Sequence, residues 1–524
     1  MIENFPFYLS LIIAIVFIIM VANKMKVAYP VLLVVAGLFI SFIPGIPTMH
    51  IDPELIFFIF LPPLLYEAAW KISWKELWRW RRIITSFAFV VVFLTAMTVA
   101  FVANSFIPGF SLALGFLLGG IVSPPDAVSA GAILKFVKVP KRMSSILEGE
   151  SLLNDASSLI IFRFALIAVA TGQFIWTTAA LSFGWMLIGG VGIGLLVGLI
   201  FMKVHKYLPT DANMDIILTL VTPYIMYLLA EEVHSSGVLA VVSGGLMLAN
   251  NHHRFLSSAS RLRGVNVWES FCFILNGMVF MLIGLALPEI TAGLGAVSLK
   301  AAIGYGVLIT VVLIVGRILS AYGAVLVTLI MRNFIKVADT RNPGLKVPLI
   351  LGWTGMRGVV SLAAALSIPV HLSDGTPFPQ RNLILFITFI VILLTLLVQG
   401  LTLPALIKKL DITAYSDNEP SNDEVYNDLR KQLAKQALLH LNNKYSHEID
   451  SHPALQQMVT RWEASQLPDE VLLAEESKVI YLDIINHQRK WLHDKNKAER
   501  HLDEDIIRKH LRHLDIEEEK MRFV

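Results

Sequence analysis

The feature that most restricts the fold of this chain is a succession of apolar runs, each roughly 20 residues long. A helix of that length crosses the roughly 30 Å hydrocarbon core of a bilayer. Only 16% of the residues are charged, whereas a soluble globular protein has about a quarter. The sequence therefore predicts an all-α polytopic membrane protein. We recognise 13 transmembrane helices, at residues 5–22, 27–43, 51–70, 83–103, 111–135, 143–171, 178–202, 213–230, 237–250, 268–288, 301–331, 348–369 and 382–407.

The loops between these spans differ in their basic residues. One set of alternate loops, which includes 71–82, holds 20 Lys and Arg, and the other set holds two, Lys300 and Arg381. Basic loops stay on the cytoplasmic side of a membrane. With an odd number of spans, we expect the N-terminus outside and the C-terminal tail in the cytoplasm. The expected location is the cell (inner) membrane.

The composition changes after residue 410. Residues 1–410 are predicted to form the transmembrane domain, and residues 411–524 a cytoplasmic helical C-terminal domain, because the latter are charged and contain no run long enough to span. Ser421 and Glu424 form a capping-box pattern at its start. The apolar residues that follow share a helical spacing and predict one stripe: Val425, Leu429 and Leu433. A regulatory role is one interpretation of this tail.

Two of the predicted spans contain features that interrupt a helix. The fifth, GGIVSPPDAVSAGAIL, holds Pro124 and Pro125 directly before Asp126, and proline clashes with the preceding helical turn. The twelfth, in GWTGMRGVVSLAAALSIP, has three glycines around Arg357. Seven spans separate the two, so they run in opposite directions, as do the broken helices in inverted repeats of secondary transporters. Asp126 and Arg357 would offset the partial charges of the half-helix ends.

The sixth span carries a polar cluster at the depth of the membrane. Glu150, Ser151, Asn154 and Asp155 fall on one side of a helix over a single turn. Burial favours a protonated carboxylate and a nearby cation favours the ionised form, so Asp155 could hold either a proton or a cation. A charged residue inside a membrane is a functional-site hypothesis by default. The competing interpretation is a polar network that holds helices together.

Glu150 lies one turn nearer the cytoplasm than Asp155 and requires a countercharge. Arg357 is the intramembrane candidate, and we predict a structural Glu150–Arg357 ion pair; the alternative is that Glu150 is a cation ligand. Glu67, in FLPPLLYEAAW, is followed by Trp70 and Lys71. It is predicted either to lie at the interface or to line the cytoplasmic path to the site.

Other charges in or near the spans have simpler predicted roles. For Arg163 in the sixth span and Arg317 in the eleventh, we expect a structural ion pair or a snorkelled position. Glu231 and Glu232 lie at an outer loop and are expected to be solvated.

Nothing in the sequence supports catalysis or a cofactor. There is no Walker loop, HExxH helix or GxSxG elbow, and the single cysteine, Cys272, excludes a disulfide framework and a cysteine-based metal site. We expect no enzymatic activity, no cofactor and no nucleic-acid partner.

Taken together, SPPDAVSA, LEGESLLNDASSL and GMRGVVSLAAALSIP resemble the NhaP/NHE branch of the monovalent cation–proton antiporters, over about residues 5–410. The resemblance implies thirteen spans in inverted repeats, two crossing broken helices and a homodimer in membrane lipid. It implies that Asp155 is the central cation and proton carboxylate, supported by Asp126 and the Pro125 backbone. Ser151 and Glu67 would complete the coordination of Na⁺ with Asp155, directly or through water.

The resemblance also bears on stoichiometry and selectivity. Asn154 precedes Asp155 where the electrogenic branch has paired aspartates, which implies electroneutral exchange of one cation per proton. The family usually has Ser-Pro-Thr-Asp, often followed by Pro, where this chain has Pro125 and Ala127, so cation preference stays open. The prediction is a Na⁺/H⁺ antiporter, with Li⁺ or K⁺ as further substrates. The alternatives are a K⁺/H⁺ antiporter and, in another class, a gated cation channel or a sensor that signals through the tail.

Overall fold

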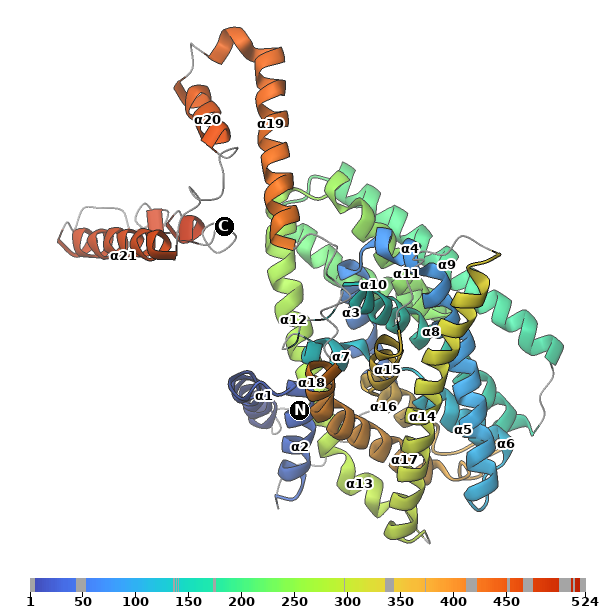
Figure 1. The fold of residues 1–524 in the computed structure, drawn as a ribbon. Helices are drawn as coiled ribbons and strands as arrows, with labels where there is room; N and C mark the ends of the chain where they lie inside the picture. The colour runs from blue at the N-terminus through green and yellow to red at the C-terminus, as the bar shows by residue number, and fades with distance from the viewer. Residues whose placement is uncertain are drawn as a thin grey trace. The chain divides into compact units, whose positions relative to one another are not determined.

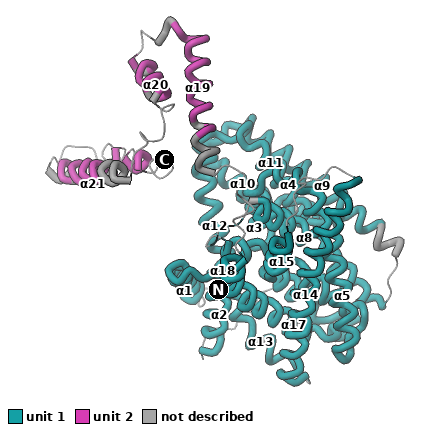
Figure 2. The backbone as a smooth tube through the Cα atoms, viewed as in Figure 1, with its two compact units in different colours: residues 1–416 teal, residues 417–524 magenta. Residues whose placement is uncertain are grey.

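The structure is a computed structural model of the 524-residue chain. The residues that it describes are 5–43, 53–134, 137, 139, 141–172, 176–295, 297–334, 344–372, 374–410, 422–449, 453–464, 475–498, 510–511 and 514–518. They form two compact units, residues 1–416 and 417–524 (Figure 2). The boundary and roles predicted for 1–410 and 411–524 stay predictions.

The first unit is a bundle of helices without a β-strand among its described residues; one isolated bridge joins His371 to Pro377 (Figure 1). Its helices are α1 (Phe5–Met25), α2 (Tyr29–Ser41), α3 (Pro53–Lys71), α4 (Trp74–Thr85), α5 (Val92–Phe106), α6 (Leu112–Val122), α7 (Ala127–Leu134), α8 (Lys141–Thr171), α9 (Trp176–Tyr207), α10 (Ala212–Glu232), α11 (Gly237–Asn251), α12 (Ser258–Leu285), α13 (Leu287–Ala292), α14 (Leu299–Met331), α15 (Lys346–Trp353), α16 (Val359–Leu366), α17 (Arg381–Leu394) and α18 (Gly400–Leu410), with π-helical segments η1 (Ser86–Val91) and η3 (Thr395–Gln399) and a 3₁₀ turn η2 (His252–Arg254).

Nine helical stretches within the described residues are long and apolar enough to cross a membrane. They confirm the all-α polytopic class, while the count of 13 stays a prediction. The stretch at Arg381–Leu410 has 78% of its most apolar window buried, and Pro6–Met25 only 22%. The last span therefore lies inside the bundle, and the first lies at its periphery, where lipid would cover it.

One predicted loop is helical. Residues 71–82 were expected to connect two spans, but α4 begins at Trp74, and its first turn is capped by Ser73, whose hydroxyl accepts from the Glu76 amide at 3.4 Å. The helix continues through η1 into α5. Its charged residues lie mainly on one face, while Trp80 packs inward and is 3% exposed. An amphipathic helix of this kind has no continuous apolar run, so a search for spans misses it.

Two helices are broken, as the sequence predicted. Residues 123–126 separate α6 from α7, and residues 354–358 separate α15 from α16. The two unwound segments meet: the Asp126 amide donates to the Met356 carbonyl at 2.7 Å. Non-helical backbone at membrane depth persists only where protein or a cavity surrounds it, and this crossing satisfies that condition.

The second unit contains α19 (Asn422–Ile449), α20 (Pro453–Ala464) and α21 (Glu475–Ala498). Its predicted cap residue, Ser421, lies outside the described residues. Leu429 and Leu433 are exposed, so these two members of the predicted apolar stripe do not form a core. On α21, Arg489 pairs with Asp515 at 2.7 Å and Glu518 at 2.5 Å, which joins that helix to the last described segment.

Candidate functional site

Arg357 lies at the crossing and is fully buried. Its Nε donates to the Val122 carbonyl at 2.8 Å and its Nη2 to the Ser123 carbonyl at 3.5 Å, while Nη1 donates to the Gly355 carbonyl. These carbonyls end α6 and follow α15. The guanidinium therefore offsets the negative ends of both half-helices, as the sequence predicted.

Asp126 has the opposite role at the same crossing. Its carboxylate accepts from the Val128 amide at 2.9 Å, the Ser129 amide at 3.4 Å and the Ser129 hydroxyl at 2.6 Å. These donors form the first turn of α7. A Cβ on Gly358, which precedes α16, would lie 2.1 Å from Asp126 Oδ2. Asp126 thus lies at the positive ends of α7 and α16, again as predicted.

Helix α8 supports the first unwound segment through two side chains. The Ser151 hydroxyl accepts from the Ala127 amide at 3.1 Å, and Asn154 Nδ2 donates to the Pro125 carbonyl at 3.3 Å. Asn154 Oδ1 is buried and has no hydrogen-bond partner in the structure. An unsatisfied buried acceptor is costly, so this amide oxygen and the Ser151 hydroxyl both have capacity for a further ligand.

Asp155 follows Asn154 on α8 and is 8% exposed. No hydrogen bond to its carboxylate is seen among the described residues, although Asp126 lies within electrostatic range. Asp155 therefore presents two uncommitted carboxylate oxygens beside the crossing. The possible cation ligands here are the Asp155 carboxylate, the Asn154 Oδ1 atom and the Ser151 hydroxyl. All are oxygen atoms, which hard monovalent and divalent cations favour.

The predicted Glu150–Arg357 ion pair is wrong. Glu150 pairs instead with Arg317 of α14, whose Nη1 and Nη2 both donate to the carboxylate, the latter at 2.8 Å. Both side chains are buried, 1% and 4% exposed. Arg357 is committed to the backbone carbonyls of the crossing. The expectation of a structural ion pair for Arg317 is confirmed.

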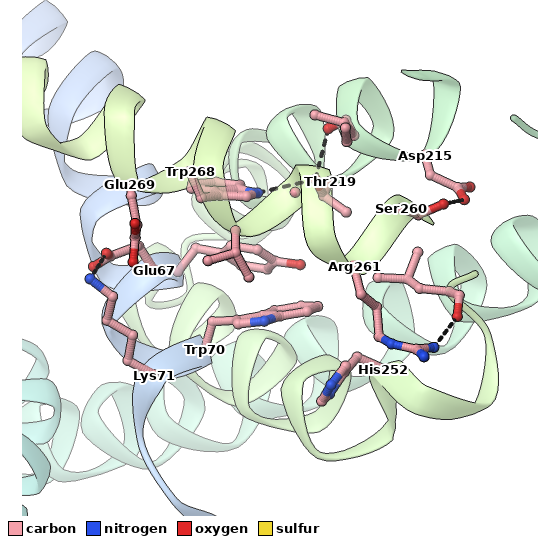
Figure 3. Close-up of a pocket in the computed structure, with 15 residues that line it drawn as sticks. Glu67, Trp70, Lys71, Asp215, Thr219, His252, Ser260, Arg261, Trp268 and Glu269 are labelled. Atoms are coloured by element: carbon pink, nitrogen blue, oxygen red, sulfur yellow. Dashed lines mark hydrogen bonds and ion pairs between the residues drawn. The ribbon is translucent and has the colours of Figure 1, made fainter. Parts of the chain in front are cut away.

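Glu67 lies on α3 and lines a cavity of about 200 Å³ (Figure 3). It pairs with Lys71 one turn along the helix. The cavity is bounded by α3, α10 and α12, with aromatic walls from Tyr66, Trp70 and Trp268. No hydrogen bond joins Glu67 to Asp155 within the described part of the chain. The structure thus brings Ser151, Asn154 and the Pro125 backbone together at the crossing, whereas the contact it shows for the Glu67 carboxylate is the pair with Lys71.

A second cavity, of about 500 Å³, lies at the opposite ends of α3 and α10. Leu159 and Arg163 of α8 and Glu231 of α10 line it. Arg163 pairs with Glu231, whose other oxygen accepts from the Gly237 amide at 3.2 Å. The ion pair expected for Arg163 is confirmed, and the expectation that Glu231 is merely solvated is wrong.

Some polar residues in the spans gave no signal in the sequence. His205 Nδ1 lies 2.8 Å from Asp215 Oδ1, and the Ser260 hydroxyl donates to Asp215 Oδ2 at 2.6 Å. This buried network joins α9, α10 and α12, and no spacing rule connects such separated residues. Gly358 is one of the three glycines singled out around Arg357 in the sequence, but its close approach to Asp126 gave no signal there. No cluster of three or more His, Cys, Asp or Glu that could hold a metal ion occurs among the described residues.

Comparison with known families gives a match over most of the chain. A family model described as "Sodium/hydrogen exchanger, transmembrane" matches residues 11–409. A protein of Bacillus subtilis named "Sodium, potassium, lithium and rubidium/H(+) antiporter" is 36% identical over 390 residues, which are 72% of this chain and 57% of that protein. The chain thus spans less than two thirds of that relative.

Other relatives are matched over more of their length. The Na(+)/H(+) antiporter ApNhaP of Aphanothece halophytica is 34% identical over 80% of this chain and 76% of its own. Among solved structures, the sodium proton antiporter MjNhaP1 of Methanocaldococcus jannaschii, at pH 8, is similar with a TM-score of 0.62. It is 20% identical, and the match covers 78% of this chain and 99% of that one. At that identity the likeness concerns the fold.

Proposed function

This chain belongs to the sodium/hydrogen exchanger family, and from that premise we propose that it exchanges a monovalent cation, in the first place Na⁺, for protons across the cell membrane. The observation that carries the proposal is the Asp155 carboxylate, buried on α8 beside the crossing and free of hydrogen bonds among the described residues. A structural acid would be expected to have donors, because burying an unpaired charge is costly.

In the proposed mechanism, Na⁺ and H⁺ compete for Asp155. A buried carboxylate favours its protonated form, and a cation beside it favours the ionised form. Binding of one substrate therefore requires release of the other. Alternating access, in which the site faces one side of the membrane and then the other, converts that competition into exchange. No nucleotide or resident cofactor takes part.

The proposed Na⁺ ligands are Asp155, Ser151 and Glu67, with the Asn154 amide oxygen beside them. Ser151 is supported by its position 3.1 Å from the Ala127 amide, which keeps its hydroxyl at the crossing. Glu67 would have to act through water or after a rearrangement, since it pairs with Lys71. Asp126 and the Pro125 carbonyl would hold the unwound backbone in place, because both already bond to it or to α8.

The ion stoichiometry proposed is one cation per proton. Asn154 carries no charge, and its Nδ2 donates to the Pro125 carbonyl at 3.3 Å, so it offers no second titrating carboxylate next to Asp155. Exchange of one positive charge for another moves no net charge, and the transport would be electroneutral. A dependence of the exchange rate on membrane potential would contradict this.

Potassium is a second candidate substrate. The Bacillus subtilis relative is named for sodium, potassium, lithium and rubidium, and an oxygen site with a free carboxylate does not by itself distinguish these ions. We further propose a homodimer with its N-terminus outside and its tail in the cytoplasm, which rests on the family and on the basic loops.

The test is a dequenching assay in everted membrane vesicles from a host that lacks its own antiporters. A pH gradient is imposed, and Na⁺, Li⁺ or K⁺ is then added. We expect Na⁺ to dissipate the gradient with the natural chain and not with Asp155→Asn, which keeps the shape of the side chain but cannot ionise. Dissipation by K⁺ alone would move the substrate to potassium.

A matched control is Glu148→Gln, an acidic residue on the same helix that is exposed and accepts from Ser144 at 2.8 Å. It should exchange like the natural chain. Full exchange by well-folded Asp155→Asn would refute the mechanism. Current without proton movement would instead indicate a channel.

A further inference from the structure

The helix that carries Asp155 is held by two ion pairs of different character. Glu150 and Arg317 join α8 to α14, and their side chains are 1% and 4% exposed. Arg163 and Glu231 join α8 to α10, and theirs are 37% and 29% exposed. Separating a buried pair leaves charges without water, whereas a partly exposed pair can be replaced by hydration. The link to α14 is therefore permanent and the link to α10 is reversible.

The reversible pair lines a cavity close to the site. That cavity, of about 500 Å³, is also lined by Leu159, which lies one turn from Asp155 on α8. Arg163 is eight residues beyond Asp155, or about 12 Å along the helix axis. The cavity is bounded on one side by α8 and by Ser367 at the end of α16, and on the other by α3, α9, α10 and α11.

The two sides of this cavity differ in their relation to the site. Helices α8 and α16 both contact the crossing, α8 through Ser151 and Asn154 and α16 through the position of Gly358 beside Asp126. Glu231 belongs to the opposite side, and the Gly237 amide at the start of α11 fixes its carboxylate at 3.2 Å. A displacement of the crossing relative to α10 and α11 would separate Arg163 from Glu231.

We propose that Arg163 and Glu231 form a gate, here called the outer gate, which must open in each exchange cycle to admit a monovalent cation to Asp155. This inference rests on the proposed function. The gate lies at the end of the molecule that the loop charges assign to the outside. While closed, it joins α8 to α10 across the cavity; when open, it lets the cavity widen. Arg163 is a positioning residue, because it does not touch the site.

The first test fixes the gate chemically. Arg163→Cys and Glu231→Cys are combined in a Cys272→Ala background, since Cys272 is the single cysteine. A short bifunctional methanethiosulfonate reagent joins the two thiols, because side chains that meet end to end leave their Cα atoms too far apart for a disulfide. We expect exchange to fall to the level of Asp155→Asn and to return after reduction. The same reagent should leave the exchange rate of each single-cysteine variant equal to that of the same variant without reagent.

Exchange by the natural chain reports on the proposed function, and the effect of the reagent on the double-cysteine protein reports on the gate. Absence of exchange in the natural chain would refute the function. Unchanged exchange in fully cross-linked protein would refute the gate alone, as would failure of the two thiols to react with one reagent molecule.

A second test neutralises the charges of the pair and requires no cysteine variants. Arg163→Gln and Glu231→Gln both break the pair and favour the open gate. Apparent affinity rises with the fraction of protein in the binding-competent state, and an open outer gate exposes the site to the outer face. The KM for the cation should therefore fall in right-side-out vesicles, where the cation is added at the outer face. It should rise in everted vesicles, where the cation is added at the cytoplasmic face. The swap Arg163→Glu with Glu231→Arg should restore both values.

Glu232→Gln is the matched control, because it removes the same charge from the adjacent, exposed position. It should leave both KM values unchanged. A merely structural role for the pair predicts lower rates on both sides with no opposed shift in KM, and that outcome would overturn the proposal even if folding were intact.

Discussion

At the scale of single residues, Asp155 differs from the other acids inside the bundle. Asp126 accepts three hydrogen bonds at the start of α7, Glu150 pairs with Arg317, and Asp215 accepts from Ser260 and contacts His205. Each of these has a structural partner. Among the described residues, Asp155 has none for its carboxylate, so its ionisation can change without breaking the fold around it.

Gly358 provides a residue-scale prediction. Its backbone lies so close to Asp126 that a Cβ would fall 2.1 Å from the carboxylate, and Asp126 cannot withdraw without losing its bonds to α7. Gly358→Ala should therefore lower stability by about 1–3 kcal/mol and impair exchange. Thermal unfolding in detergent measures the first effect. Gly316→Ala, on α14 with open space around it, is the control, and equal melting temperatures would contradict the prediction.

The sequence predicted the individual charges of the site better than their partners. Asp126 and Asp155 stood out because each interrupts a long apolar run, where a charge is expensive. The partner of Glu150 did not follow, because Arg317 and Arg357 are both intramembrane cations and composition cannot distinguish them. Packing decides: Arg357 donates to carbonyls at the crossing that no other described side chain is seen to bond, which leaves Arg317 for Glu150.

At the scale of elements, α8 is the helix through which the others meet the site. It bonds to the unwound segment through Ser151 and Asn154, to α14 through Glu150, and to η1 through Ser157, whose hydroxyl donates to the Ala88 carbonyl. A helix fixed along its length in this way presents Asp155 in one orientation. Because it has 31 residues, α8 also reaches the partly exposed pair at Arg163.

The Glu150–Arg317 pair provides an element-scale prediction. Glu150→Gln leaves a buried guanidinium without its countercharge and should destabilise the bundle by about 3–5 kcal/mol. Arg163→Gln, which breaks the half-exposed pair on the same helix, should cost about 0–1 kcal/mol. Thermal unfolding followed by tryptophan fluorescence compares the two. Similar melting temperatures would show that the two links of α8 do not differ as their burial indicates.

Elements were predictable where hydrophobicity dominates. Apolar runs located the spans, and the Pro124-Pro125 pair located one break. The helix α4 was missed because its Lys and Arg residues leave no apolar run that a span search detects, although Trp80 and Ile84 pack inward. The short halves α15 and α16, of eight residues each, depend on the crossing with α6 and α7, and no local pattern specifies that contact.

At the scale of the whole molecule, the chain consists of an intramembrane unit and a charged helical unit. A chain that ends at residue 416 should therefore insert and exchange cations at the natural rate, because every residue of the crossing precedes that point. Vesicle dequenching with matched expression measures this. Loss of exchange in a truncated chain that still inserts would show that the tail is part of the transport machinery.

The crossing has a consequence for how the protein is made. Arg357, which neutralises the end of α6, follows Val122 by 235 residues. At about 5–20 residues per second, the ribosome needs on the order of 10–50 s to synthesise that interval. Throughout this time the nascent first half holds a half-helix whose carbonyl end has no counterpart. Biogenesis of this protein therefore includes an interval in which its earliest broken helix depends on the insertion machinery, rather than on the chain itself, for a polar partner.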